Sequence, residues 1–253
     1  MMRFPLIVAH AGCENTPTHT AASVLAGLRA GADMVEIDLR LTRDGVPVLY
    51  HEAYLDAAPA PVRLRDLSYL ELSDLARQGR ILLPPAEGRL TRLEEILDIV
   101  KSFDKAINLD IKEDEVIGPT LAAVKKAGMQ ESVILSGCER ERACYVKDHY
   151  RGFQVLLNAS LGRGDYRGAV RKICREAVAC SCCGVNLRYQ ECTEELVEYA
   201  RTRFLPVSIW TVDDEADMER VTRMGIQAVA TNRVAVMMRI KRDRIKKTLK
   251  EVL

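Results

Sequence analysis

The sequence predicts an α/β fold, a single (β/α)8 TIM barrel spanning residues 1–253. Short apolar, β-branched runs alternate with longer segments of helical period, which is typical of repeated βα units around a parallel sheet. Eight such runs occur, and eight parallel strands are the number that closes this kind of barrel. The predicted strands are Leu6–Ala9, Met34–Leu41, Ala106–Ile111, Ser132–Leu135, Phe153–Leu157, Gly184–Leu187, Leu205–Trp210 and Ala228–Thr231.

The glycines between these runs agree with alternating strands and helices. Gly31, Gly128, Gly152 and Gly225 each come just before a predicted strand, where a helix is expected to end. The alternative is an open doubly wound sheet, but no glycine-rich phosphate-binding loop follows the first predicted strand. The length of 253 residues also suits one barrel, so a single domain is expected.

One connection departs from the alternation of strand and helix that a barrel requires. A second short strand, Pro47–Tyr50, follows the second barrel strand and leads into a segment that contains four prolines. We interpret residues 52–91 as a small insertion. Insertions after early strands lie at the C-terminal face of a barrel, where active sites are found, so this segment is expected to overhang the site.

Charge and hydropathy limit the classes of partner. The formal net charge is +1, so no overall field recruits nucleic acid. No stretch approaches the roughly 20 apolar residues of a membrane helix, and the N-terminal apolar run is shorter than a secretory core. A cytoplasmic protein without stable membrane insertion is therefore expected. The basic helix predicted over Val234–Leu253 could touch membranes, but the solvated face of a last barrel helix is the favoured interpretation.

The eight cysteines are expected to be reduced thiols rather than a disulfide framework. Five of them lie between Cys174 and Cys192, and Cys180 with Cys183 has the spacing of a soft-metal pair. No second pair and no nearby histidine completes such a site. Small thiols that pack as apolar groups are the favoured interpretation.

Candidate metal ligands occur on the second and third predicted strands. Glu36 and Asp38 are two residues apart, so they project from the same face of their strand. Two carboxylates inside a barrel are unfavourable unless a cation or hydrogen bonds compensate them, and oxygen ligands suit Mg²⁺ or Ca²⁺. Asp110 and Lys112 repeat this spacing on the next strand, where they form either a structural ion pair or part of the site.

These residues belong to a set of short motifs that follow one another in a fixed order. The motifs are His10-Ala11-Gly12, Glu36-Ile37-Asp38, Thr42-Arg43-Asp44-Gly45, His51-Glu52, Asp110-Ile111-Lys112, Trp210-Thr211-Val212-Asp213 and Thr231-Asn232-Arg233. In order and spacing they resemble the glycerophosphodiester phosphodiesterase family, which reads His-Arg-Gly, Glu-x-Asp, Thr-x-Asp-Gly, His-Asp, Glu-x-Lys, Trp-Thr-Val and Thr-Asp-Arg-Pro. Each fragment alone is weak, but the ordered set covers nearly the whole chain.

The family's Pro-Glu-Asn-Thr segment needs care in placing. Glu14-Asn15-Thr16 looks like it, but the family spacing back from Glu36 selects Thr20 instead. The counterpart is then Pro17-Thr18-His19-Thr20. Glu14 becomes a loop residue near the mouth of the site. His19 is most simply a helix N-terminal residue, and contact with the substrate is the alternative.

The resemblance implies a metal-dependent hydrolase of phosphodiesters. Glu36, Asp38 and Asp110 would hold one divalent cation, Mg²⁺ or Ca²⁺. His10 and His51 would flank the phosphate, one as general base and the other as general acid. Either histidine could instead be a structural residue at a strand end, but their combination with three carboxylates favours the catalytic interpretation.

The substrate-binding residues depart from the family pattern. Ala11 occupies the place of the arginine that grips the phosphate in the family, and Lys112 lacks the bidentate fork of an arginine. Arg188, after the sixth predicted strand, is the candidate replacement. Trp210, from the Trp-Thr-Val motif, completes the expected substrate-binding set.

Three functional hypotheses follow for a small-molecule phosphodiester as substrate. The first is hydrolysis of a glycerophosphodiester to an alcohol and glycerol 3-phosphate. The second is the same chemistry on a lysophospholipid or a sugar phosphodiester, prompted by Ala11. The third is a catalytically silent barrel that binds a phosphorylated ligand, against which the retained histidines and carboxylates argue. The alcohol and the oligomeric state stay open.

Overall fold

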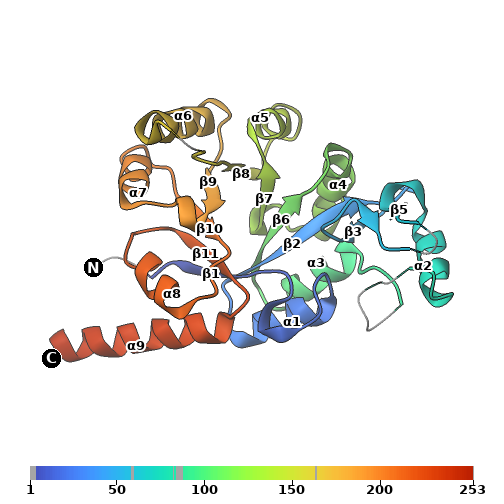
Figure 1. The fold of residues 1–253 in the computed structure, drawn as a ribbon, viewed down its shortest axis with the longest axis horizontal. Helices are drawn as coiled ribbons and strands as arrows, with labels where there is room; N and C mark the ends of the chain where they lie inside the picture. Colours follow the sequence, from blue (N-terminus) through green and yellow to red (C-terminus); the bar gives the residue numbers. More distant parts are fainter. Residues whose placement is uncertain (1–3, 58–59, 82, 84–87, 163, 253) are drawn as a thin grey trace.

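Eight parallel strands form a closed barrel in the computed structural model, which describes residues 4–57, 60–81, 83, 88–162 and 164–252 (Figure 1). The strands are β1 (Leu6–Ala9), β2 (Met34–Leu41), β6 (Ala106–Ile111), β7 (Val133–Cys138), β8 (Gln154–Asn158), β9 (Gly184–Arg188), β10 (Val207–Trp210) and β11 (Ala228–Thr231). Because β1 pairs with both β11 and β2, the sheet has no open edge at that point. The predicted (β/α)8 barrel is confirmed.

Most strand boundaries also agree with the sequence pattern. Four of the eight match at both ends, and the others differ by up to three residues, because hydrophobicity does not mark where ladder hydrogen bonds stop. Gly31 and Gly128 cap their helices in the left-handed conformation, as expected. Gly152 and Gly225 are not caps: their helices end earlier, at His149 and Val221, and both glycines lie in the turns that follow.

Helices cover the outside of the barrel, one between successive strands (Figure 1). They are α1 (Ala21–Ala30), α3 (Leu93–Ser102), α4 (Ile117–Ala127), α5 (Arg140–His149), α6 (Tyr166–Ala179), α7 (Glu194–Arg201), α8 (Glu215–Val221) and α9 (Val234–Val252). Short 3₁₀ turns occupy Cys13–Asn15, Leu64–Asp66, Asp114–Val116, Gln130–Ser132 and Tyr189–Glu191.

The alternation of side chains along each strand separates the core from the site. In β2, Val35, Ile37 and Leu39 are buried against the helices, whereas Glu36 and Asp38 face the barrel interior. An apolar cluster lies in the interior. Its buried members are Val8, Met34, Ala228 and Ala230, and Leu6, Ala106, Ile134 and Trp210 pack against them. TIM-barrel interiors are usually filled by bulky branched side chains. Here alanines at positions 228 and 230 take the place of such side chains and leave room for a cavity.

The connection after β2 forms a unit of its own at the edge of the barrel. β3 (Pro47–Leu49) pairs antiparallel with β2, and the hairpin β4 (Tyr54–Leu55) and β5 (Val62–Arg63) and the helix α2 (Tyr69–Arg77) follow (Figure 1). A separate apolar cluster joins them: Val48, Leu55, Leu64, Leu72, Ile81 and Leu90.

The described residues of the insertion do not meet the expectation that this segment overhangs the site. None of those from Glu52 to Thr91 lines the main cavity. Its apolar cluster packs on β3 instead, and this contact places the segment beside the barrel. Arg89 ties its end to α3 with hydrogen bonds of 2.7 and 2.8 Å to the carboxylate of Glu95, which lower the pKa of Glu95 to about 2.

One pair of cysteines contradicts the expectation of eight reduced thiols. Cys144 in α5 and Cys180, directly after α6, form a disulfide. They are 36 residues apart in sequence, so spacing did not reveal that these two neighbouring helices bring them together. This bond also removes Cys180 from the suggested pair with Cys183. The other six cysteines are free, and all but Cys183 are buried, in agreement with apolar packing.

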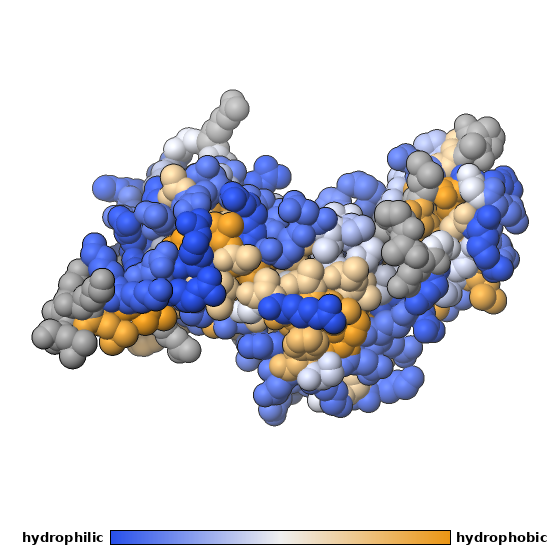
Figure 2. Space-filling view, turned by 90° about the horizontal axis from the view of Figure 1, so that it is seen from below, coloured by the Kyte–Doolittle hydropathy of each residue, from blue (hydrophilic) through white to orange (hydrophobic). Residues whose placement is uncertain are grey.

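The last helix begins in the core and ends in solvent. Val234 and Met237 of α9 are fully buried, whereas Ile245 and Leu249 are exposed. The face of the molecule seen in Figure 2 is mainly hydrophilic, with apolar side chains in several separate areas. In the part of the chain that the structure describes, no helix is long and apolar enough to cross a membrane.

Candidate active site

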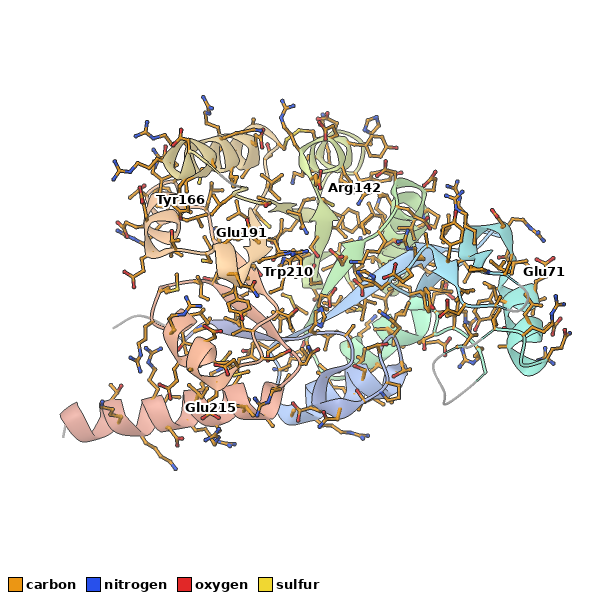
Figure 3. All side chains as sticks on the ribbon, viewed as in Figure 1. Glu71, Arg142, Tyr166, Glu191, Trp210 and Glu215 are labelled. Atoms are coloured by element: carbon orange, nitrogen blue, oxygen red, sulfur yellow. A yellow bond between two sulfur atoms is a disulfide. The ribbon has the colours of Figure 1, made fainter. Side chains whose placement is uncertain are left out.

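The barrel interior holds a cavity of about 670 Å³. Inward-facing residues from all eight barrel strands line it, because alternate residues of each strand point to this side. Figure 3 shows Trp210 inside the ring of helices and Arg142 at α5, both far from Glu71 in α2. Trp210 and Arg142 both line the cavity. The cavity reaches the C-terminal ends of the strands, where TIM barrels carry their active sites.

Three buried carboxylates face this cavity from two adjacent strands. β2 and β6 pair in parallel with Asp38 opposite Asp110, and Glu36 lies two residues earlier on β2. One oxygen from each of the three lies within 4.8 Å of the others, and the residues are 5 to 9% exposed. In the described ranges, this is the one group of side chains with metal-binding spacing. The sequence therefore predicted correctly which carboxylates come together.

Lysine supplies part of the positive charge that these carboxylates need. The Nζ atom of Lys112 lies 2.8 Å from Oδ1 of Asp38 and also contacts Asp110. Burial lowers the pKa of Lys112, but the charges of Asp110 and Asp38 outweigh it, and the pKa is raised. Burial, together with Asp38 and Asp110, raises the pKa of Glu36 well above its usual range.

The acidic triad fits a divalent cation. One ammonium group faces three carboxylates, so a further positive charge would stabilise the ionised form of Glu36. The donors are all oxygen atoms, which is the set that hard cations prefer. Ser136 donates to Oδ1 of Asp110 at 2.8 Å and orients it. A Cβ atom at Gly137 would lie 2.8 Å from the same oxygen, so only glycine fits there.

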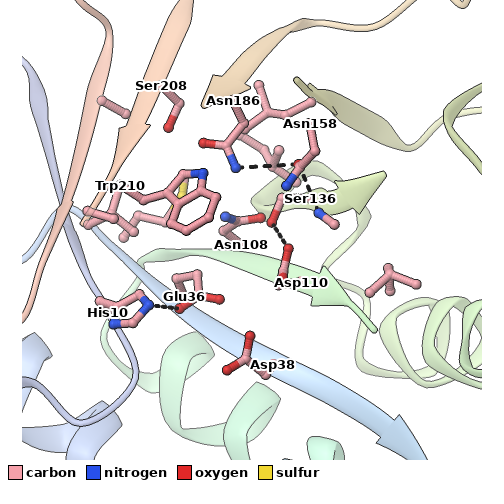
Figure 4. A pocket seen from close by; sticks show the side chains of 18 of the residues that line it. His10, Glu36, Asp38, Asn108, Asp110, Ser136, Asn158, Asn186, Ser208 and Trp210 are labelled. Atoms are coloured by element: carbon pink, nitrogen blue, oxygen red, sulfur yellow. Dashed lines mark hydrogen bonds and ion pairs between the residues drawn. The ribbon is translucent and has the colours of Figure 1, made fainter. Parts of the chain in front are cut away.

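Two residues that follow the last two strands hold His10 through a chain of hydrogen bonds: Asn232 follows β11, and Asp213 follows β10. Asn232 donates through Nδ2 to Asp213 at 2.7 Å, so its Oδ1 must face the other way, toward Nδ1 of His10 at 3.0 Å. Oδ1 can only accept, and therefore Nδ1 of His10 carries the hydrogen. Nε2 is then the unprotonated nitrogen in the neutral ring. It lies 3.8 Å from Oε2 of Glu36 (Figure 4).

His51 also lines the cavity, but its ring makes fewer hydrogen bonds to distant parts of the chain than the ring of His10 does. It follows β3, its side chain is 54% exposed, and Nδ1 bonds to Oε1 of Glu52 at 2.6 Å. The backbone oxygen of His51 accepts two hydrogen bonds from Arg40, at 2.8 and 3.0 Å. The structure thus brings both predicted histidines to one cavity.

His19 lies closer to the triad than the sequence analysis expected. Its Nδ1 is 3.7 Å from Oδ2 of Asp38, and its side chain is only 11% exposed. Burial lowers the pKa of His19. The position before Thr20, the N-cap of α1, was the available signal, because a helix start after β1 faces the same end of the barrel.

The predicted substrate-binding residues separate into two groups. Lys112 and Trp210 line the cavity of the acidic triad. Arg188 does not; it lines a neighbouring cavity of about 850 Å³, which Trp210 also borders. The guanidinium of Arg188 lies 5.5 Å from the ring centre of Trp210. Arg188 therefore lies beside the indole in the neighbouring cavity and does not line the cavity of the acidic triad, and its role in substrate binding stays a prediction.

A different arginine lines the main cavity. Arg142, in the first turn of α5, donates to the backbone oxygens of Ile111 and Gly137 at 2.6 and 2.5 Å and to Asp114 at 2.6 Å. These bonds tie the ends of β6 and β7 together near Asp110. Arg142 was not predicted from the sequence, although an arginine at a helix start after a barrel strand is a usable signal.

The loop after β1 agrees with the placement of the family motif at Pro17-Thr18-His19-Thr20. Thr20 caps α1 by accepting a hydrogen bond from the backbone of Ser23. Glu14 accepts from the backbone nitrogen of Ala235 at 3.1 Å, so it caps α9 and is no metal ligand. The backbone nitrogen of Ala11 faces Oε2 of Glu36 at 3.4 Å, in the position where the family carries its arginine.

Comparison with known proteins agrees with this geometry. Residues 10–236 match the model of the glycerophosphoryl diester phosphodiesterase family. The chain belongs to this family. It is thus, by family, a phosphoric diester hydrolase, and the resemblance seen in the motifs is confirmed.

Individual relatives match over most of their length. A glycerophosphodiester phosphodiesterase of Caldanaerobacter subterraneus subsp. tengcongensis is 25% identical over 234 residues, which cover 90% of this chain and 93% of the relative. A putative glycerophosphoryl diester phosphodiesterase from Silicibacter pomeroyi superposes with a TM-score of 0.81 at 20% identity, covering 95% of this chain and 94% of that one. An Oleispira antarctica phosphodiesterase, solved with the product sn-glycerol-3-phosphate, gives 0.76 at 20% identity, covering 93% and 96%.

Proposed function

We propose that this chain hydrolyses glycerophosphodiesters to an alcohol and glycerol 3-phosphate. The observation that carries the proposal is the convergence of the acidic triad and two histidines on one cavity at the C-terminal face of the barrel. A binding-only barrel has no use for two histidines placed for proton transfer. The family membership is consistent with this chemistry, and the Oleispira antarctica relative was solved with that phosphomonoester.

A cation is part of the proposal. Glu36, Asp38 and Asp110 would hold one divalent ion, Mg²⁺ or Ca²⁺, which when bound polarises the phosphodiester. Lys112, which already balances Asp38 and Asp110, would contact a phosphate oxygen. Trp210 would form a wall of the substrate pocket, and Arg188, beyond the indole, would meet the part of the alcohol that extends into the neighbouring cavity.

The histidines are proposed to move the protons. His10 presents Nε2 without a proton in its neutral form, so it would accept the proton of the attacking water or of a neighbouring substrate hydroxyl. The oxygen of that group bonds to phosphorus as the bond to the leaving alcohol breaks. His51 would donate a proton to the departing alkoxide through Nε2, because Nδ1 is engaged by Glu52.

The test is a panel of phosphodiesters assayed with Mg²⁺, Ca²⁺ and Mn²⁺, following released phosphomonoester. We expect hydrolysis that chelation abolishes and that the added cation restores. Glu36→Gln should weaken metal binding, measured by calorimetry, and remove nearly all turnover while the fold, checked by circular dichroism, stays intact. Unchanged metal affinity in the folded variant would remove Glu36 from the metal shell, and binding without turnover would favour a silent barrel.

The proposal also concerns the partner and the location of the protein. We expect the partner to be a small-molecule phosphodiester and not a nucleic acid, and a cytoplasmic location stays a prediction. Hydrolysis of a sugar phosphodiester is the alternative that a specific observation favours, namely the polar side chains inside the barrel.

A further inference from the structure

The last helix, α9, extends beyond the ring of barrel helices (Figure 1). Arg244 of α9 donates to the backbone oxygen of Thr222 at 2.8 Å, and its guanidinium lies 5.9 Å from the ring centre of Phe4. Phe4 precedes β1 and Thr222 follows α8, so Arg244 stands level with the beginnings of the strands. Residues 245–252 therefore project past the N-terminal face of the barrel by about 12 Å, and we call them the projecting segment.

The apolar stripe that packs α9 on the barrel continues into the projecting segment. Val234, Met238, Ile245 and Leu249 lie on one side of the helix, because they are separated by close to whole helical turns. Val234 is fully buried, and Met238 packs against the core. Ile245 and Leu249 are 48% and 57% exposed. The outer half of the stripe thus has the composition of a packed face but is open to solvent.

The same face of the barrel carries other exposed apolar side chains. Phe204, between α7 and β10, is 94% exposed, Val178 in the last turn of α6 is 58% exposed, and Phe103 after α3 is 36% exposed. Connections from a helix to the next strand lie at the N-terminal face of a barrel. Single exposed apolar residues are ordinary, but here they gather on the face from which α9 projects.

Positive charge flanks the apolar stripe of the projecting segment. Arg242, Lys246 and Lys247 are exposed, and in the described part of the chain none of them pairs with a carboxylate. From Arg239 to Leu249 the sequence has six lysines and arginines and one acidic residue. The net charge of +1 therefore conceals a strongly basic end of α9.

An anionic lipid surface is complementary to this combination. Its headgroups can pair with the cations of α9, while its interfacial region takes up the side chains of Ile245, Leu249 and Phe204. A second copy of the chain fits less well, because contact between two projecting segments would bring like charges together. The acidic triad lies toward the opposite, C-terminal face, so its cavity would stay open to water in the docked protein.

We propose that the N-terminal face of the barrel docks on an anionic lipid membrane through the projecting segment, the cations beside it and Phe204. The protein lies on the surface in this arrangement and does not span the bilayer. The proposal concerns the face opposite the acidic triad, so it is independent of the proposed function.

The test is sedimentation of the full chain with vesicles of phosphatidylcholine alone and of phosphatidylcholine with about one third phosphatidylserine. We expect binding to the anionic vesicles, weak binding to the neutral ones, and release as salt is added, because salt screens the charges. Each lysine or arginine near an anionic surface contributes about fivefold to binding. The charge variant, Arg242→Gln, Lys246→Gln and Lys247→Gln together, should therefore bind on the order of a hundredfold more weakly.

A second variant tests the apolar contribution. The apolar variant combines Ile245→Ser, Leu249→Ser and Phe204→Ser and should bind at least about tenfold more weakly to the same vesicles, because it removes side chains that enter the interface. All three side chains are largely exposed, so its melting temperature should stay close to that of the wild type.

Two matched controls remove equal features elsewhere. Arg167→Gln, Arg171→Gln and Arg175→Gln together remove three exposed positive charges from α6. Tyr54→Ser with Leu70→Ser removes two exposed apolar side chains from the insertion, where they are 58% and 71% exposed. Both control variants should bind anionic vesicles like the wild type, since neither changes the N-terminal face.

Four outcomes would overturn the proposal. They are equal binding to neutral and anionic vesicles, no binding to either, a charge or apolar variant that binds like the wild type, and control variants that lose as much binding as the test variants. Analytical ultracentrifugation supplies a separate check. Self-association that the apolar variant abolishes would assign this face to a second copy of the chain instead. Because none of these measurements follows turnover, failure to hydrolyse a phosphodiester would count against the proposed function alone.

Discussion

The two histidines of the candidate site differ in how the fold supports them. His10 sits at the end of β1, and a chain through Asn232 to Asp213 determines which of its nitrogens carries the hydrogen. His51 follows β3 at the edge of the barrel and its side chain is 54% exposed. Among the described residues, only the adjacent Glu52 bonds to its ring. The fold therefore fixes the orientation of the His10 ring, whereas the ring of His51 is held by its neighbour in the sequence.

This difference indicates separate demands on the two positions. A group that must accept a proton in one geometry gains from a fixed tautomer, whereas a group that protonates a departing alcohol must tolerate alcohols of different shape. Four substitutions test the contrast.

The largest effect is expected at His10. His10→Ala removes the proposed base and should lower kcat/KM by about 1,000-fold, within the range for general acid–base catalysis. The measurement is release of phosphomonoester from a glycerophosphodiester with saturating Mg²⁺. Retained metal binding in the variant is the control. Activity within a few fold of the wild type would remove His10 from the chemistry.

His51→Ala should lower kcat/KM by about 100-fold for substrates with a poor leaving group. The loss should shrink for an aryl diester such as a nitrophenyl ester, because that alcohol leaves without a proton. A His10→Ala variant assayed on the same pair should show no such recovery. Equal losses on both substrates would contradict the assignment of His51 as the acid.

Asn232→Ala should lower kcat by about tenfold with little change in KM, because it releases the ring of His10 without removing a substrate contact. Asn232→Asp, which restores the family's residue, is the conservative comparison and should recover most of the activity. Adding Asn232→Ala to His10→Ala should cost little more, since the two act through one group. Additive losses would show that Asn232 has another role.

The smallest effect is expected at Glu52. Glu52→Gln keeps a hydrogen-bond acceptor for His51 on an exposed surface, so kcat/KM should fall by no more than about threefold. The same assay measures it, with the change in melting temperature as a structural control. A loss as large as that of His51→Ala would mean that the orientation of His51 depends on Glu52 as strongly as that of His10 is expected to depend on Asn232.

Several features of the site could be predicted from the sequence because they are local. The two-residue spacing of Glu36 and Asp38 places both on one face of a strand, and Asp110 repeats this on the next strand of the sheet. Parallel pairing then sets Asp38 opposite Asp110. Spacing back from Glu36 also selected Thr20 as the counterpart of the family's threonine, and the structure shows that Thr20 caps α1.

Other features were wrong or missed because they depend on side-chain direction. Arg188 ends the sixth barrel strand, as its position indicates, but its guanidinium lies 5.5 Å from the ring centre of Trp210 and lines the neighbouring cavity. His19 looked like an ordinary helix-start residue, yet its ring is buried against Asp38. The Cys144–Cys180 bond joins two helices whose proximity follows from the winding of the barrel.

By itself the sequence determined the strand order, the faces of the strands and the residue types at their ends, because these follow from periodicity and from the rules of βα connection. Only the tertiary structure decided that Asn232 meets His10 across 222 residues and that small interior side chains leave a cavity of about 670 Å³. Closure of the barrel brings the first and last strands together. The empty space is the sum of many side-chain volumes, and no single motif encodes that sum.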